Sequence, residues 1–202
     1  MADTKRKILD KALELFNERG SEKTTVRHIA AELGISHGNL CYHYPNTDEI
    51  VKALYNELVS HLNSSISAAV EFSLVDLMQV TEKTFELFYQ YRFILIEFVA
   101  IARRIHEVKT HFRELQKHRD AEFGMMFQRL QEDGLMKPEL FPGQYELLKE
   151  QMTLVGDFWM SEAEILFDGS REEKIRHYAR LFNSLMVPYL TEKGIMLYLI
   201  DM

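Results

Sequence analysis

Residues 24–44 read TTVRHIAAELGISHGNLCYHY, and this stretch decides the fold of the 202-residue chain. Thr24 or Thr25 can cap a short helix that ends at Gly34. Ser36 can then cap a further helix that starts at His37. The first of the two helices spaces apolar side chains along one face: Val26, Ile29, Ala30 and Leu33. We therefore predict two short helices joined by a tight turn.

The second of these helices has little to bury. Leu40 is its main aliphatic anchor, and the other side chains from His37 to Tyr44 are mostly polar or aromatic. The pair satisfies the spacing of a helix-turn-helix, with small Ala30 at the helix crossing and Gly34 in the turn. Its core positions are apolar: Ile29, Leu33, Ile35 and Leu40. In this motif the start of the second helix enters the major groove, so the segment predicts a DNA-binding surface.

Helical patterns continue on both sides of this segment. Residues 4–19 form an amphipathic stripe closed by Gly20. Asn46 can cap a long helix that runs to about Glu71, with Glu49 reaching back in a capping box. Further helices are predicted over residues 74–90, 93–105, 109–132, 144–167 and 171–189. We expect an all-α fold, in which an N-terminal three-helix domain is joined by a long helix to a C-terminal helical bundle.

The charge is unevenly distributed along the chain. There are 24 basic and 31 acidic residues, which give a formal net charge of −7. Nucleic-acid-binding domains are often basic, so this average argues against DNA binding. Through Thr47, however, seven basic residues stand against six acidic ones, and the remainder carries −8. The N-terminal segment is therefore the better candidate for contact with phosphates.

The location of the protein follows from what the sequence lacks. Cys41 is the single cysteine, so no internal disulfide forms. No signal peptide is recognised, and the longest apolar run, residues 93–102, is interrupted by Glu97 and is shorter than the roughly 20 residues that cross a bilayer. We expect a cytoplasmic protein without a membrane segment. The apolar tail, residues 195–200, is expected to pack on the body or on a partner.

Residues 4 to about 55 resemble the DNA-binding domain of the TetR family. The resemblance rests on residues 24–30 and 34–44, where Thr-Thr-Val-Arg, a short turn and a compact helix ending in His plus an aromatic follow one another. It implies a DNA-binding domain over residues 1–47, and an effector-binding and dimerisation domain over residues 48–202. The implied protein is a homodimeric repressor that binds a palindromic operator and is released by a small molecule.

The resemblance also implies which side chains contact DNA. Asn39 is the leading candidate to read a base, because an amide can bond adenine through two hydrogen bonds. Cys41 stands where the family usually has Tyr, and Thr47 where it often has Lys, so we expect modest affinity with strong salt dependence. Arg6 and Lys7 are further candidates for phosphate contacts. The full set of DNA-binding candidates is Lys5, Thr25, Arg27, Ser36, His37, Asn39, Tyr42, His43 and Thr47.

Residues 75–170 resemble the C-terminal domain of bacterial repressors, which implies dimerisation and often an effector pocket. We expect a mostly apolar effector, because apolar cavities with few polar groups suit such molecules. Glu97 needs a partner if it is buried, either an internal Arg or Tyr or a cationic ligand. The pocket candidates are Phe88, Phe93, Glu97, Met126, Phe158 and Trp159, although for any one of the apolar residues core or interface packing is the more common role. The dimer candidates are Met152, Val155, Trp159, Tyr178, Phe182 and Leu185.

Other functions remain open at this point. His37 and Cys41 are four residues apart, which suits a metal or redox sensor, but no nearby residue completes a metal site, so neither a metal nor a cofactor is expected. A helical enzyme that uses Asp157, Glu97 or His106 is a remote alternative, because the sequence lacks an activated nucleophile and a phosphate-binding loop. A DNA-binding regulator without an inducer is the nearer alternative.

Overall fold

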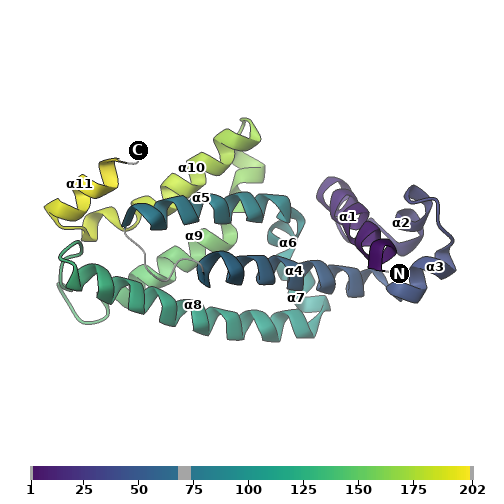
Figure 1. Cartoon of the computed structure of the whole chain (residues 1–202), viewed down its shortest axis with the longest axis horizontal. Coiled ribbons are helices and arrows are strands. Elements are labelled where there is room, and N and C mark those ends of the chain that lie inside the picture. Colours follow the sequence, from purple (N-terminus) through teal and green to yellow (C-terminus); the bar gives the residue numbers. More distant parts are fainter. Residues whose placement is uncertain (1, 68–73, 201–202) are drawn as a thin grey trace.

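The computed structural model describes residues 2–67 and 74–200, and in these ranges the fold is all-α (Figure 1). All but one of the DNA-binding candidates lie on α1 (Ala2–Arg19), α2 (Val26–Glu32), α3 (His37–His43) and their connections, and Thr47 is the first residue of the next helix. The remaining helices are α4 (Thr47–Ser67), α5 (Leu74–Gln90), α6 (Arg92–Ile96), α7 (Phe98–Arg104), α8 (His106–Glu132), α9 (Gln144–Leu166), α10 (Arg171–Ser184) and α11 (Glu192–Ile200). The predicted fold class is confirmed.

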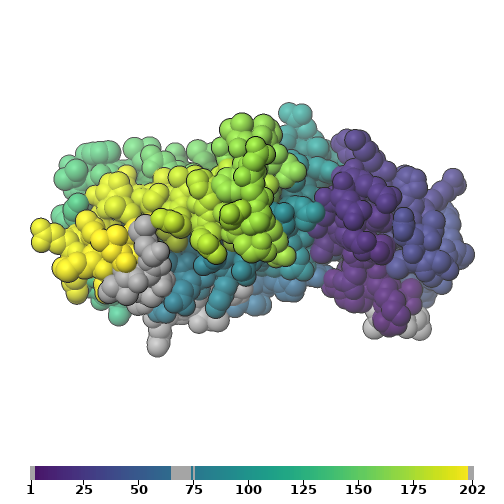
Figure 2. Space-filling model, turned by 90° about the horizontal axis from the view of Figure 1, so that it is seen from above, coloured from purple at the N-terminus to yellow at the C-terminus, as the bar shows by residue number. Residues whose placement is uncertain are grey.

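The N-terminal helices form a compact unit at one end of an elongated molecule (Figures 1 and 2). Three side-chain caps define it: Thr25 Oγ1 accepts from His28 N at 3.3 Å, Ser36 Oγ from Asn39 N at 3.1 Å, and Asn46 Oδ1 from Glu49 N at 2.9 Å. Gly34 has φ +65°, which favours glycine in this turn. Leu40 is fully buried between the helices. The predicted helix-turn-helix is therefore present.

One predicted cap is wrong in detail. Glu49 does not reach back toward Asn46, since its carboxylate accepts from Lys52 Nζ at 2.8 Å. The capping boxes lie elsewhere: His28 Nδ1 accepts from Thr25 N at 3.3 Å, and Glu173 pairs in the same way with Ser170. Lys52, three residues further on, thus takes the place of the Asn46 N–H as the partner of this carboxylate.

The body differs from the predicted helices at three places, of which one is the additional helix α11. The predicted helix over 93–105 is two helices, because Glu97, with φ −97° and ψ 9°, lies between α6 and α7. The last predicted helix ends at Ser184, and a 3-10 turn at Val187–Tyr189 contains Pro188. The predicted end of the long helix near Glu71 lies outside the described residues.

Aromatic side chains fill the core of the body between α5, α9 and α10. Phe85 stacks on Trp159 with ring centroids 4.9 Å apart, and it also contacts Phe182 at 5.6 Å. Tyr178 lies 5.1 Å from Trp159 on the other side. Buried aromatic rings supply large apolar areas and prefer such offset or tilted contacts. This cluster fixes α10 against α5 and α9.

The C-terminal tail packs on the body, as its composition predicts. Thr191 N donates to Leu135 O at 2.9 Å, and Leu190 pairs with Met136 in an isolated bridge. Tyr198 on α11 is buried. None of the described helices is long and apolar enough to cross a membrane.

We predict that Gly194→Ala destabilises the protein and that Gly124→Ala does not. A Cβ at Gly194 would lie 2.2 Å from the carbonyl oxygen of Leu135, whereas one at Gly124, within α8, meets nothing within 4 Å. Urea unfolding should show a loss of about 1–3 kcal/mol for the first variant. The second should gain about 0.5–1 kcal/mol, the usual effect of replacing a helical glycine. Equal stabilities would contradict the docking of α11 on the Leu135 loop.

Candidate DNA interface and effector cavity

The side chains predicted to contact DNA gather on one exposed surface of α2 and α3. Asn39 has no side-chain partner among the described residues, and Tyr42 is 76% exposed. His43 and Thr47 are half-buried, and Thr47 Oγ1 donates to Thr24 O at 3.4 Å. The exposed members of the set are Lys5, Thr25, Arg27, Ser36, His37, Asn39 and Tyr42. These seven side chains are therefore accessible to a ligand.

Intramolecular ion pairs leave few cations free for phosphates. Arg6 Nη1 lies 2.7 Å from Glu57 Oε2, and Lys7 Nζ lies 2.7 Å from Asp3 Oδ2, so these two cations are already paired. Lys5 lies over the ring of Tyr44 at 5.4 Å. In the described ranges neither Arg27 nor Lys23 has an acidic partner. Lys23 is a candidate that the motif did not indicate, since it lies in the loop before α2.

His37 and Cys41 contact one another on α3. Cys41 Sγ lies 3.3 Å from His37 Nε2. Within residues 2–67 and 74–200 no group of three His, Cys, Asp or Glu could hold a metal ion. The contact therefore stays a feature of the recognition helix, without a ligand set around it.

Helix α1 is fastened to the body by packing and hydrogen bonds. Phe16 and Phe93 have ring centroids 5.0 Å apart, so Phe93 belongs to this junction and does not line the cavity for which it is a candidate. Asn17 Oδ1 accepts from Phe93 N at 3.1 Å. Glu57 on α4 accepts from Arg6 at 2.7 Å and from Tyr91 Oη at 2.7 Å. Burial and this bond raise the pKa of Tyr91.

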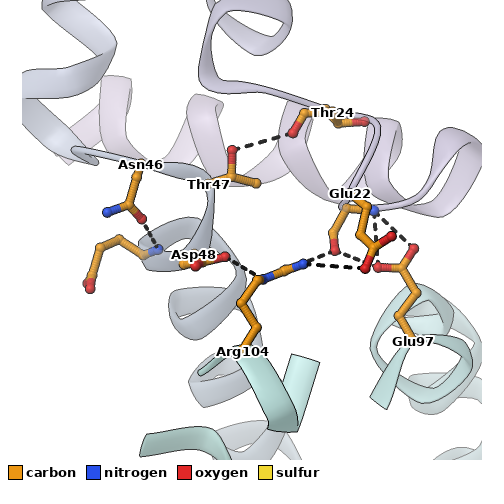
Figure 3. A network of polar contacts seen from close by, with 9 residues as sticks. Glu22, Thr24, Asn46, Thr47, Asp48, Glu97 and Arg104 are labelled. Atoms are coloured by element: carbon orange, nitrogen blue, oxygen red, sulfur yellow. Dashed lines mark hydrogen bonds and ion pairs between the residues drawn. The ribbon is translucent and has the colours of Figure 1, made fainter. Parts of the chain in front are cut away.

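Glu97 binds the turn between α1 and α2 (Figure 3). Its carboxylate accepts from Ser21 N at 3.0 and 3.2 Å and from Ser21 Oγ at 2.5 Å. Arg104 joins the same network, 2.7 Å from Asp48 and 3.2 Å from Ser21 Oγ. Glu97 is thus absent from the cavity, and its partner is a serine rather than the expected Arg, Tyr or cationic ligand. We call this contact the Ser21–Glu97 latch.

The body contains a cavity of about 200 Å³ between α4, α5, α8, α9 and α10. Of the six pocket candidates, Phe88 and Met126 line it. Trp159 lies behind its wall, stacked on the lining ring of Phe85, and Phe158 is 42% exposed on the outside. Aromatic content indicated that a cavity exists, but it could not separate lining rings from core rings.

An ion pair that the sequence did not assign to the pocket lines both this cavity and a smaller one of about 40 Å³. Arg119 Nη1 lies 3.2 Å from Asp157 Oδ1, and Gln116 Nε2 donates to Asp157 Oδ2. Burial raises the pKa of Asp157, while Arg119 opposes the shift. Burial also raises the pKa of Tyr55, in the smaller cavity, to about 12. The cavities therefore combine apolar walls with one ion pair, and the exposed Glu122 also lines the larger cavity.

The dimer candidates divide into buried and accessible residues. Met152, Trp159, Tyr178 and Phe182 are buried within the protomer, and Val155 and Leu185 are half-buried. Other apolar side chains of α9 and α10 are exposed, namely Leu147, Leu154, Phe158, Ile165 and Leu181. A partner subunit on these helices would meet this exposed set, which we call the α9–α10 face.

We predict that Glu97→Ala destabilises the protein, whereas Glu114→Ala does not. Removal of Glu97 leaves the N–H of buried Ser21 without its acceptor, which costs about 1–3 kcal/mol. Glu114 is exposed on α8 and is a control without a side-chain partner among the described residues. Urea unfolding of both variants measures the difference. An unchanged midpoint for Glu97→Ala would show that the latch contributes nothing.

Two family models match the chain. Residues 8–54 match a model described as bacterial regulatory proteins of the tetR family, and residues 54–197 match one described as a bacterial transcriptional repressor. The boundary between the matches falls within α4, seven residues beyond the predicted boundary at residue 47. Together the two models cover nearly the whole chain.

Individual relatives agree with the family models. The biofilm-operon regulator IcaR of Staphylococcus epidermidis is 32% identical over 96 residues, 43% of this chain and 52% of that protein. The chain thus spans about half the length of this curated relative. A TetR-family regulator from Marinobacter aquaeolei has a TM-score of 0.85 at 26% identity, over 94% of this chain and 92% of that one.

A further solved structure shares the fold alone. This is a regulator from Saccharomonospora viridis in complex with choline, with a TM-score of 0.74 at 17% identity over 95% of this chain and all of that one. The two family models match adjoining segments that together contain the helix-turn-helix and the helical body. The chain therefore belongs to the TetR family of bacterial transcriptional repressors.

Proposed function

We propose that two copies of this chain pair through the α9–α10 face and present their α3 helices to successive major grooves of a palindromic operator. The exposed start of α3 carries the proposal, because Ser36, His37 and Asn39 lie open while Leu40 anchors the helix from below. In such dimers the two recognition helices lie about 34–36 Å apart on one face of the duplex. Asn39 is the leading base reader, and Thr25, Arg27 and Tyr42 contact the phosphates.

The α9–α10 face supports dimerisation. Leu147, Leu154, Phe158 and Ile165 follow one another at intervals of seven, four and seven residues, so they lie on one side of α9. Large apolar side chains that gather on an exposed face mark an interaction surface. Two copies of a helix pair related by a two-fold axis form a four-helix interface.

An effector in the larger cavity can act on the DNA-binding helices through the side chains that it shares with the smaller cavity, and from there through α6 and α7. Ile94, Leu95 and Phe98 line the smaller cavity, and Glu97 lies among them in the chain. A ligand that shifts these helices changes the position of Glu97, and with it the α1–α2 turn that Glu97 holds. The proposed effector thus favours a dimer whose α3 helices no longer match the grooves, which lowers DNA affinity by population shift. The choline complex of the Saccharomonospora protein supports a ligand site in this kind of body.

Two further points complete the proposal. The protein acts by binding rather than by catalysis, and its DNA target places it in the cytoplasm. A regulator of the same fold without an inducer is the second candidate, favoured by the small size of the 200 Å³ cavity. A screen for small molecules that lower DNA affinity separates the two.

DNA binding is tested with the region upstream of the protein's own gene and a scrambled duplex of equal length. We expect a clear preference for the upstream DNA, because base contacts add specificity to phosphate binding. Asn39→Ala should weaken specific binding by about 1–3 kcal/mol, the value of one bidentate base contact. Asn63→Ala, at an exposed position on α4, is the matched control. The proposal fails if the wild-type protein binds the two duplexes equally.

Dimerisation is tested with Leu154→Glu. Leu154 is 60% exposed in the middle of the α9–α10 face, so a carboxylate there would be buried unpaired in the interface. Sedimentation equilibrium should find this variant monomeric at concentrations where the wild type is dimeric. Met125→Glu, at a 64% exposed position on α8, should remain a dimer. A dimeric Leu154→Glu protein would place the interface elsewhere.

A further inference from the structure

In the ion pair between Arg119 and Asp157, every oxygen of the carboxylate has a hydrogen-bond partner, but most donors of the guanidinium have none in the described part of the chain. Both oxygens of Asp157 are occupied, Oδ1 by Arg119 Nη1 at 3.2 Å and Oδ2 by Gln116 Nε2. A guanidinium carries five N–H donors, and only the Asp157 contact uses one of them in the described part of the chain. The side chains are 17% and 12% exposed, so water reaches the unused donors poorly.

A ligand that carries a hydrogen-bond acceptor can bind the unused donors of Arg119. Arg119 lines both cavities, so a ligand in the larger one can reach its guanidinium. A planar guanidinium binds a carboxylate through two parallel hydrogen bonds. This interaction is stronger than a single hydrogen bond to a neutral acceptor. A cationic ligand has no comparable partner, because the charge of Asp157 is already paired with Arg119 and each of its oxygens accepts a hydrogen bond. Glu122 also lines the larger cavity, but it is exposed to water.

The rest of the wall suits a short apolar chain or ring. Leu77, Phe85, Phe88, Phe123, Met126 and Phe182 are among the apolar residues that line the larger cavity. Its volume is about 200 Å³. An apolar cavity of ~150 Å³ holds benzene, so this one suits an apolar part of somewhat more than six non-hydrogen atoms, about eight.

We propose that the effector is a small lipophilic carboxylate, whose head group bonds Arg119 and whose apolar part fills the cavity lined by Phe85, Phe88 and Phe123. This inference rests on the proposed function, since it names the chemical class of the proposed effector. The site is formed by side chains of α8 and α5 in one protomer.

Octanoate, octan-1-ol and octyltrimethylammonium are three probes with the same alkyl chain and different head groups. Trp159 is the only tryptophan and stacks on the lining ring of Phe85, so its fluorescence in the full-length protein reports occupancy. We expect octanoate to bind at least about tenfold more tightly than octan-1-ol, because a hydrogen bond between charged groups is worth that factor or more. Octanoate affinity equal to or below that of the alcohol, or tightest binding of the ammonium, overturns the proposal.

Variants at residue 119 test whether Arg119 causes the preference for octanoate over octan-1-ol. Arg119→Met alone leaves Asp157 without its cation, so the double variant Arg119→Met/Asp157→Asn is made as well. The double variant should lose the preference for octanoate and keep its affinity for octan-1-ol. Arg129→Met, at an exposed position of the same helix, should keep the preference. A double variant that still prefers octanoate overturns the assignment.

The outcome is separate from that of the proposed function. The affinity of the same protein for upstream DNA is measured with and without octanoate. If octanoate binds through Arg119 and DNA affinity stays unchanged, the binding site stands and the proposed effector response fails. If DNA affinity is specific and octanoate does not bind, the repressor function stands and the carboxylate proposal fails.

Discussion

The position of the DNA-binding helices depends on the contact between the α1–α2 turn and the body. Ser21 is buried in this turn, and its N–H and hydroxyl are both bound by the carboxylate of Glu97. A side chain at Gly20 would disturb this contact, because φ there is +83°, which favours glycine, and a Cβ would lie 2.6 Å from Glu97 Oε1. A buried backbone N–H must be satisfied, so in the proposed effector response the turn moves with Glu97 when α6 and α7 move. One carboxylate thus links α6 and α7, which line the smaller cavity, to the turn before α2.

The charge distribution makes this geometry necessary for DNA binding. The body carries −8 and repels a phosphate backbone, while the first 47 residues carry only +1 and several of their cations are paired internally. The elongated shape keeps α2 and α3 at the end remote from most of the body (Figures 1 and 2). In the proposed complex, hydrogen bonds from a well-placed α3 therefore contribute more to binding than long-range attraction, which salt screens within about 10 Å.

The sequence predicts the features that local interactions determine. Caps at Thr25, Ser36 and Asn46, and the buried anchor Leu40, follow from residue type and spacing over a few positions. The break at Glu97 could not be predicted, because the apolar run around it suits a continuous helix, and only the partner Ser21, 76 residues away, explains the interruption.

The residues of the cavity and of the α9–α10 face also could not be predicted from local sequence alone. Phe88 and Phe93 look alike in sequence, yet one lines the cavity and the other packs on Phe16. On α9 the pattern reveals two apolar sides, and only the fold shows that Trp159 faces the core while Leu154 faces outward. When a helix is apolar on both sides, its sequence does not show which side packs on its own protomer. Tertiary packing determines that.

Hydroxyl-radical footprinting of the upstream DNA with the full-length protein tests the central claim most directly, since it reports how two α3 helices contact one duplex. The account predicts two protected patches on one face of the helix, with centres about 10 base pairs apart or a multiple of that. A single protected patch, or uniform protection along the duplex, would contradict it.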